Sequence, residues 1–491
     1  MTGPYGLLSP VWAATSTAEL MSEDSVLRAL VRVEAAWAQT LVEAGEAPAE
    51  SAEAIRRISV DPALAGLRAQ DIAAEGTGGG NPVIPMLAAV RDALQQSGES
   101  DAALHRGATS QDILDTALML LIREAVQGIT DDLRRAGAAL STLSEDHSRT
   151  LCVARSLTQH ALPTCFGLRS AGWLDGVTQS MGRLETAAAT LPLQWGGAVG
   201  NQAALSDSVG FEQAEQMTSA LAARLGLAPM RRPWHTQRQT MLDIAAALAA
   251  VLAQLGKAAG DVLILQRPEI AEVREPRTAG RGGSSAMPQK QNPVLSTLIR
   301  SAALSAPGQL STLYVAAATA EDERPAGAWH AEWPSLVELV RLAGGAASRA
   351  AELFEGFEVR PESMRANLAL SGDAVVSERL LARLSDSFPG GKSALQQLLK
   401  RSAVEGLPLR SLLEDQLDPA VIGPEDLDQL LDPREYLGRA QEFIGTAVAD
   451  FRAASSPAKN DSAPAASTPA ASTPAASTPA ASTPEGVTEH A

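Results

Sequence analysis

Apolar residues recur at the spacing of one helical face along most of the chain. The first such run opens behind Ser22, a hydroxyl residue suited to cap a helix, and two acidic residues follow it directly. Further runs near residues 112–146, 165–190 and 237–266 are each longer than an average globular helix. Long helices with short connections predict a helical bundle.

The same pattern divides the chain into segments. We expect an N-terminal helical domain at residues 1–108, a central long-helix bundle at 109–355, a C-terminal helical domain at 356–452 and a tail at 453–491. In the tail the sequence AASTP repeats, so regular prolines prevent a continuing helix and little large apolar surface is present to bury. We predict a disordered, solubilising tail, with a polyproline docking segment as the alternative.

The composition favours helices over sheets. Of the 491 residues, 45% are hydrophobic, which is enough for a large core, but only 3% are aromatic, and strands prefer aromatic and β-branched residues. We therefore expect an all-α protein. The formal net charge of -17 argues against a nucleic-acid-binding protein, so an anionic substrate must be met by a few local cations.

Location and metal content are also predicted from the sequence. The N-terminus has no basic segment followed by an apolar one, so we expect no signal peptide. The apolar stretch at 241–265 is long enough to cross a membrane, but charged residues interrupt it, which favours a buried bundle helix. Cys152 and Cys165 are too few for a disulfide framework or a cysteine metal site. We predict a cytoplasmic protein without a metal or a membrane partner.

The most informative segment is RGGSSAMPQKQNP at residues 281–293. Its glycines allow unusual backbone angles, while its prolines restrict the residues around them, so it predicts a mobile loop with fixed ends. Within the loop, the Ser284 hydroxyl lies six residues before Lys290 and eight before Asn292. These groups can converge on one site. The alternative is a flexible Gly-Ser surface loop.

This segment resembles the GSSxMPxKxNP signature of the fumarase/aspartase superfamily. The resemblance implies that Ser284 is a catalytic base that deprotonates a carbon next to a carboxylate. A serine hydroxyl is a weak base unless its anion is stabilised, so loop N–H groups and the Lys290 ammonium would have to stabilise it. Lys290 and Asn292 would also hold the substrate carboxylate, whose enolate-like charge grows in the transition state.

A second block, LHRGATSQD at residues 104–112, resembles the HxGxTSxD element of the same superfamily. Thr109 and Ser110 are typical helix caps, and the free N–H groups behind them form a natural carboxylate site. The resemblance implies that Thr109, Ser110 and Gln111 contact the substrate. Simple helix capping is the alternative for Thr109 and Ser110, and the two roles can coexist. His105 is a candidate charge partner or proton donor, with a structural role, which is commoner for a single histidine before a helix, as the alternative.

A third block, RSLTQHALP at residues 155–163, matches the superfamily's GRTHxQxAxP element only in part. Leu157 stands where other branches have a histidine, and Thr297 stands where they have its glutamate partner. The loss of both halves of this proton relay argues against fumarase and adenylosuccinate lyase chemistry. His160 would share a helical face with Leu157 if the segment were helical, and it is our candidate for the remaining acid.

Segments PWHTQR at 233–238, AWHAEW at 328–333 and DPREYLG at 432–438 resemble the cycloisomerase branch of the superfamily. Gln237 is a candidate amide donor to a substrate carboxylate or lactone carbonyl. Trp329 and Trp333 are expected to pack in the core.

The resemblance implies a three-domain all-α fold of the fumarase/aspartase type and a homotetramer with active sites shared between subunits. It also implies cofactor-free cyclisation of 3-carboxy-cis,cis-muconate, a tricarboxylate, to 4-carboxymuconolactone in protocatechuate degradation. Run backwards, this reaction is a β-elimination. Arg155, Arg281 and Lys290 would then form a local positive site for the substrate carboxylates.

The signature loop departs from the cycloisomerase pattern. Gln289 and Gln291 stand where cycloisomerases carry histidine and arginine beside the loop lysine. This leaves two alternatives: a lyase for another substituted succinate, of nitrosuccinate or adenylosuccinate type, and a catalytically silent homologue. The intact Ser284, Lys290 and Asn292 argue against the silent homologue.

Overall fold

The computed structural model describes residues 6–284 and 286–456, and its internal contacts divide the chain into two units, Met1–Ala454 and Ser455–Ala491. All helices and strands below belong to the first unit, except for the last residue of the final helix. The tail predicted at 453–491 lies, from residue 457 on, outside the described residues.

Short helices make up the N-terminal part of the first unit. They are α1 (Ser16–Leu20), α2 (Glu23–Glu43), α3 (Ala49–Val60), α4 (Ala69–Gly79) and α5 (Val83–Gln96). Helix α2 begins where the sequence predicts, because Ser22 Oγ accepts a hydrogen bond from the Ser25 N–H at 3.3 Å. Its buried face, which includes Leu30, Trp37 and Leu41, packs α2 against α3 and α6.

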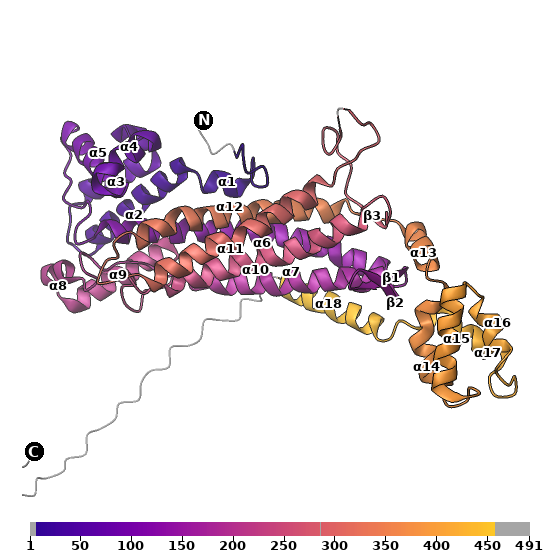
Figure 1. The fold of residues 1–491 in the computed structure, drawn as a ribbon. Coiled ribbons are helices and arrows are strands. Elements are labelled where there is room, and N and C mark those ends of the chain that lie inside the picture. Colours follow the sequence, from indigo (N-terminus) through magenta and orange to yellow (C-terminus); the bar gives the residue numbers. More distant parts are fainter. Residues whose placement is uncertain (1–5, 285, 457–491) are drawn as a thin grey trace, which may run out of the picture. The chain divides into compact units, whose positions relative to one another are not determined.

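The long helices form a bundle in which each helix packs against its neighbours (Figure 1). They are α6 (Ser110–Asp146), α7 (Phe166–Ala189), α10 (Gln239–Leu265), α11 (Val294–Ala318) and α12 (Ala328–Glu355), with α8 (Ala203–Val209) and α9 (Phe211–Leu225) between α7 and α10. The apolar runs predicted near 112–146, 165–190 and 237–266 correspond to α6, α7 and α10. The all-α bundle expected from the sequence is confirmed.

Helices α10 and α11 are apolar beyond the faces that they bury. Helix α10 is long and apolar enough to cross a membrane, with a mean hydropathy of 1.6, but it packs against α7, α11 and α12 as a bundle helix. On α11, Leu304, Tyr314 and Val315 remain 73%, 49% and 60% exposed. Exposed apolar surface of this kind is typical of a face that another chain covers.

A β-hairpin interrupts the helices after α6. Strand β1 (Leu151–Ser156) pairs antiparallel with β2 (Gln159–Cys165), and Leu157 and Thr158 form the turn with φ angles of 50° and 74°. The expectation that His160 shares a helical face with Leu157 is wrong, because the two residues lie on a hairpin. A second small sheet pairs β3 (Val273–Arg274) with β4 (Glu358–Val359).

The C-terminal part contains α13 (Pro361–Ala369), α14 (Ser377–Leu384), α15 (Gly391–Glu405), α16 (Leu409–Glu414), α17 (Pro424–Leu431) and α18 (Ala440–Ser455), and short 3-10 helices occupy Pro62–Ala65, Gly372–Val376 and Pro433–Glu435. Helices α14 to α17 share a hydrophobic cluster of their own, and Val153 of β1 is buried in that cluster. The hairpin is therefore anchored in the C-terminal helices. Helix α18 returns to the bundle, where Phe451 lies against Gly137 of α6.

Candidate active site

The N-terminus of α6 carries the block that contains Thr109 and Ser110. Thr109 caps the helix, and its backbone N–H donates to the Asp112 carboxylate at 3.0 Å. The N–H groups of Ser110 and Gln111 have no acceptor among the described residues. Such N–H groups attract an anion, because the helix dipole adds to their partial positive charge. This turn can hold a carboxylate, while its contact with substrate stays a prediction.

Asp112 fixes this turn from inside the protein. Its carboxylate is fully buried and accepts hydrogen bonds from the backbone N–H groups of Gly196 at 2.7 Å and Gly197 at 2.9 Å. His235 Nε2 lies 2.9 Å from the same carboxylate. A side chain at Gly196 would lie 2.8 Å from the His235 ring, so only glycine allows this close approach. Asp112 thus ties the start of α6 to the segment that follows α7.

A buried charge network lies one helical turn further along α6. The Arg238 guanidinium lies between two carboxylates, 2.6 Å from Asp115 and 2.6 Å from Glu332, and all of these side chains are buried. Burial raises the pKa of the Glu332 carboxyl, and Arg238 opposes this effect. Burial alone would lower the pKa of Arg238, but the two carboxylates raise it above its ordinary value.

Gln111 belongs to this network. Its side chain is buried, and its Nε2 donates to the His235 carbonyl at 2.9 Å and to Asp115 at 3.3 Å. The Gln111 side chain therefore points into the protein, and its contact with substrate stays a prediction.

The aromatic blocks supply the rest of the network. Trp329 is buried and donates its indole N–H to Asp115 at 2.9 Å, so its predicted packing role is confirmed. Trp333 is half-buried and packs edge-on against Trp329, with ring centroids 4.6 Å apart. Gln237 is exposed and makes no hydrogen bond with a described residue, so its proposed role as a substrate donor stays a prediction.

Arg324 is a candidate site residue that sequence analysis missed. It precedes α12, and its guanidinium donates to Thr109 Oγ at 2.6 Å and to the Ala198 carbonyl at 3.2 Å. It forms no ion pair with a carboxylate of a described residue. An arginine fork beside a helix N-terminus suits a carboxylate ligand. No local pattern marked it, since it lies 215 residues from Thr109 in an acidic stretch that is typical of a surface loop.

The β1–β2 hairpin carries Arg155 and His160, which pair across the strands. Arg155 is already paired, because its guanidinium lies 2.6 Å from the fully buried Glu272 carboxylate, to which Arg169 also lies within 3.6 Å. His160 is exposed, and its Nδ1 lies 2.8 Å from Ser371 Oγ. Leu157, at the turn, is 94% exposed. The structure places His160 beside the C-terminal helices, and its role as an acid stays a prediction.

The signature loop lies between β3 and α11. Ser284 Oγ accepts a hydrogen bond from the Met287 N–H at 3.2 Å, an arrangement that would also stabilise the serine anion. Asn292 donates from Nδ2 to the Gly282 carbonyl at 3.1 Å, so it closes the base of the loop. Gly282 has a φ of 73°, and a side chain there would lie 2.5 Å from the Asn292 carbonyl oxygen. The predicted fixed ends are therefore present.

The cations predicted around this loop differ in availability. Arg281 is paired, with Nη2 2.5 Å from Glu352 of α12. Lys290 is exposed, and no described residue forms an ion pair with its ammonium. Arg155 is also paired. Of the three predicted cations, Lys290 is therefore the one without an ion-pair partner among the described residues, and Arg324 adds a further cation beside Thr109.

The blocks do not meet within one chain. Helix α6 spans 37 residues, which corresponds to about 55 Å. Thr109 lies at its start, while the hairpin follows its end (Figure 1). The signature loop is tied to the hairpin end, because Glu272, which precedes the loop segment 281–293 in the chain, holds Arg155. Glu275 caps α11 through the Leu295 and Ser296 N–H groups at 3.0 and 2.7 Å.

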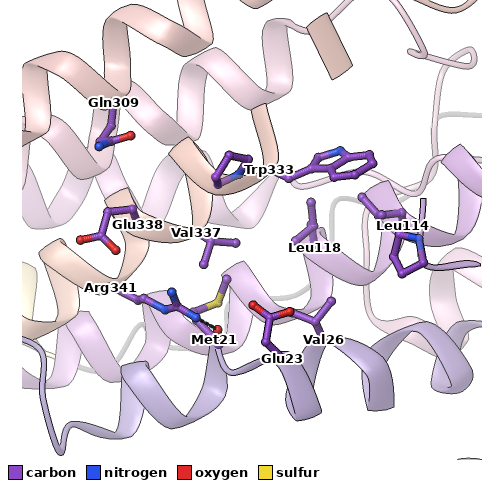
Figure 2. Close-up of a pocket in the computed structure, with 12 residues that line it drawn as sticks. Met21, Glu23, Val26, Leu114, Leu118, Gln309, Trp333, Val337, Glu338 and Arg341 are labelled. Carbon is purple, nitrogen blue, oxygen red and sulfur yellow. Dashed lines mark hydrogen bonds between the residues drawn. The ribbon is translucent and has the colours of Figure 1, made fainter. Parts of the chain in front are cut away.

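A cavity of about 540 Å³ lies between the N-terminal helices and the bundle. Figure 2 shows Leu118 and Val337 along its wall, with Glu338 and Arg341 on one side. Burial lowers the pKa of Arg341, whose guanidinium donates to the Met21 carbonyl. None of the predicted site residues lines this cavity, so it is separate from the carboxylate site at α6.

Residues 8–308 match a family described as Lyase. The chain belongs to this lyase family. It is 43% identical to a nitrosuccinate lyase of Streptomyces davaonensis, over 90% of this chain and 94% of that protein. It is 38% identical to a 3-carboxy-cis,cis-muconate cycloisomerase of Pseudomonas aeruginosa, over 91% of this chain and 96% of that protein.

Solved structures agree with this assignment. The 3-carboxy-cis,cis-muconate lactonizing enzyme of Pseudomonas putida superimposes with a TM-score of 0.82 at 34% identity, covering 91% of this chain and 99% of that one. The resemblance to the fumarase/aspartase superfamily, and to its cycloisomerase branch, is confirmed, and the chain is an enzyme of the lyase and cycloisomerase type. Among the described residues, no cluster of histidine, cysteine or acidic side chains is arranged to hold a metal.

Proposed function

We propose that the enzyme eliminates nitrite from nitrosuccinate and leaves fumarate. A base takes a proton from the carbon next to one carboxylate, the C–N bond breaks with its electron pair on the departing nitrite, and a C=C bond forms. The 43% identical nitrosuccinate lyase supports this substrate. The replacement of two loop cations by Gln289 and Gln291 also supports a substrate with fewer carboxylates than carboxymuconate.

The observation that carries the proposal is the replacement of both halves of the proton relay. Leu157 is an apolar side chain, and Thr297 donates its hydroxyl to the Pro293 carbonyl at 2.6 Å, so neither is a general acid. Leaving groups such as amines and hydroxide need a proton from an acid, whereas nitrite and carboxylates are weak bases that depart as anions. The site therefore suits a weakly basic leaving group.

In this proposal Ser284 is the base, and the Lys290 ammonium with the loop N–H groups stabilises both its anion and the enolate-like carboxylate. Thr109, Ser110 and Arg324 hold the other carboxylate at the N-terminus of α6. Elimination from a dicarboxylate then needs one carboxylate site at each end of the substrate, which matches these two sets of groups.

We propose that each active site is shared between copies of the chain in a cytoplasmic homotetramer. The length of α6 supports sharing, because about 55 Å separates the Thr109 turn from the hairpin in one chain. The exposed apolar residues of α11 support an assembly through the bundle, since water is a poor environment for such a face.

A second candidate is the lactonising cyclisation of 3-carboxy-cis,cis-muconate to 4-carboxymuconolactone. It is supported by the 38% identical cycloisomerase and by the likeness to the Pseudomonas putida enzyme. Its reverse expels a carboxylate, which is also a weak base, so the missing relay fits this reaction as well.

The experiment is to incubate the purified enzyme separately with nitrosuccinate, with 3-carboxy-cis,cis-muconate and with adenylosuccinate. Nitrite is measured colorimetrically, fumarate by its ultraviolet absorbance, and lactone by loss of the muconate absorbance. Stoichiometric nitrite and fumarate are expected. Lactone without nitrite would move the assignment to the second candidate, and adenylosuccinate cleavage would overturn the argument from the leaving group.

Arg324→Met is expected to lower kcat/KM by about 10- to 100-fold, because it removes a charge-assisted hydrogen bond to the substrate carboxylate. The effect should fall mainly on KM if the contact is equally strong in the ground state. Steady-state kinetics measure it, with Arg56→Met as the control, since Arg56 pairs with Glu53 on the surface of α3. If the two variants had equal kcat/KM, Arg324 would not bind the substrate.

Leu157→Gly is expected to change stability and activity in opposite directions. Leu157 has a φ of 50° at an exposed turn, a conformation that costs a branched residue about 1–2 kcal/mol and that glycine adopts freely. The variant should therefore unfold at a higher temperature. We expect kcat/KM to fall, because Leu157 stands where other branches of the superfamily have the histidine of the proton relay. Ala14→Gly, at a φ of 58° in the N-terminal segment, is the matched control and should leave kinetics unchanged. Unchanged kinetics for Leu157→Gly would mean that the turn does not reach a substrate.

A further inference from the structure

A buried carboxylate on α2 holds the histidine that precedes α6. Glu34 is 1% exposed, and its two oxygens accept from the backbone N–H of His105 at 3.0 Å and lie 2.7 Å from its Nδ1. His105 has a φ of 57°, a left-handed conformation that is unusual for histidine. Both the backbone and the ring of this strained residue are therefore fixed by one side chain.

This contact determines which ring nitrogen is available. A carboxylate only accepts hydrogen bonds, so the proton between Glu34 and His105 lies on Nδ1. Nε2 has no hydrogen-bond partner among the described residues. The free nitrogen belongs to a ring only four residues before Thr109, the cap of α6.

The rest of the turn is also held in place. The Trp37 indole N–H donates to the Arg106 carbonyl at 2.8 Å, and Arg106 donates to Ser208 Oγ at 2.9 Å. Gly107 has a φ of 70°, and a side chain there would lie 3.4 Å from Leu205. A turn with this many contacts keeps one conformation, as a preorganised binding site requires.

We propose that Glu34 is a positioning residue that orients His105 so that its Nε2 hydrogen-bonds a substrate oxygen beside the Thr109 turn. When both ring nitrogens carry protons, Nε2–H donates to the substrate oxygen while Nδ1–H donates to the Glu34 carboxylate. No covalent step is involved. This inference rests on the proposed function, since it takes the α6 N-terminus as the place of a substrate carboxylate.

His105→Asn separates the two ends of the ring. An asparagine amide can reproduce the Nδ1–H donor to Glu34, and asparagine tolerates a positive φ, but it has no group at the place of Nε2. We expect the variant to melt within a few degrees of the wild type and to lose about 10- to 100-fold in kcat/KM. His147→Asn, at the opposite end of α6, is the matched control and should keep wild-type kinetics. A His105→Asn enzyme with wild-type kinetics would overturn the proposal.

Glu34→Gln tests the positioning role. It should lower kcat/KM by about tenfold in the wild type but cause no further loss in the His105→Asn background, because that background lacks the Nε2 atom that Glu34 positions. Additive losses would show an independent structural role and overturn the inference.

Different results would contradict the positioning role of Glu34 and the proposed reaction. Nitrite release that depends on Ser284 but not on His105 would contradict the positioning role alone. Absence of nitrite release by the wild type would contradict the proposed substrate, and the same variants would then be measured on carboxymuconate.

Discussion

Ser284→Ala is expected to lower kcat by about 10²- to 10⁴-fold, the range typical of a lost general base. Alanine cannot carry the proton taken from the substrate carbon, while the loop keeps its closure through Gly282 and Asn292. Binding of the product fumarate should therefore survive, and calorimetry can measure it alongside the kinetics. Loss of turnover with retained binding assigns the hydroxyl to the chemical step.

Ser59→Ala is a suitable control for this variant. Ser59 lies on α3, where its hydroxyl donates to the Arg56 carbonyl and contacts none of the candidate site residues. It should turn over substrate at the wild-type rate. A Ser284→Ala enzyme that retained full kcat would remove the serine from the mechanism, whatever the family likeness.

Arg238→Met is expected to destabilise the protein by about 3–5 kcal/mol. The substitution leaves Asp115 and Glu332 buried without their shared cation, and removal of one member of a buried ion pair strands the others. Thermal unfolding and the yield of soluble protein measure the effect. Activity should fall as well, since Asp115 also receives the Gln111 and Trp329 donors beneath the α6 N-terminus.

The matched control is Arg135→Met, in which an arginine between two acids is lost from the surface. Arg135 pairs with Glu355 and Asp132 while about half exposed, and exposed pairs contribute about 0–1 kcal/mol. Adding Glu332→Gln to Arg238→Met should recover part of the loss, because burial already raises the pKa of Glu332 and favours its neutral form. Equal stability of the two methionine variants would contradict the role given to the buried network.

The helices were predictable because their signals are local. The cap at Ser22 and the periodic apolar residues behind it specify α2 within a short window of sequence, and the same holds for α6. The hairpin was not predictable in this way. Its turn residues, Leu157 and Thr158, are not the Asn-Gly type that marks a two-residue turn, and its strands are short.

The candidate site was predictable where a motif lies in one stretch of chain. The signature loop and the Thr109 turn were found from their own residues. Pairings across the chain carried no such signal: Glu34 is 71 residues from His105, and Glu272 is 117 residues from Arg155. The second case matters for substrate binding, because Arg155, which was predicted to bind a substrate carboxylate, is already held by a buried carboxylate of the protein.

The distance along α6 has a genetic consequence. In the proposed assembly, one copy of the chain contributes its Thr109 turn to one active site and its Ser284 loop to another. A mutant chain with a defect in either segment would therefore inactivate a site whose other residues come from wild-type chains. Mutant alleles of this kind should be partly dominant when expressed with the wild type, and two alleles damaged at opposite ends should partly complement each other.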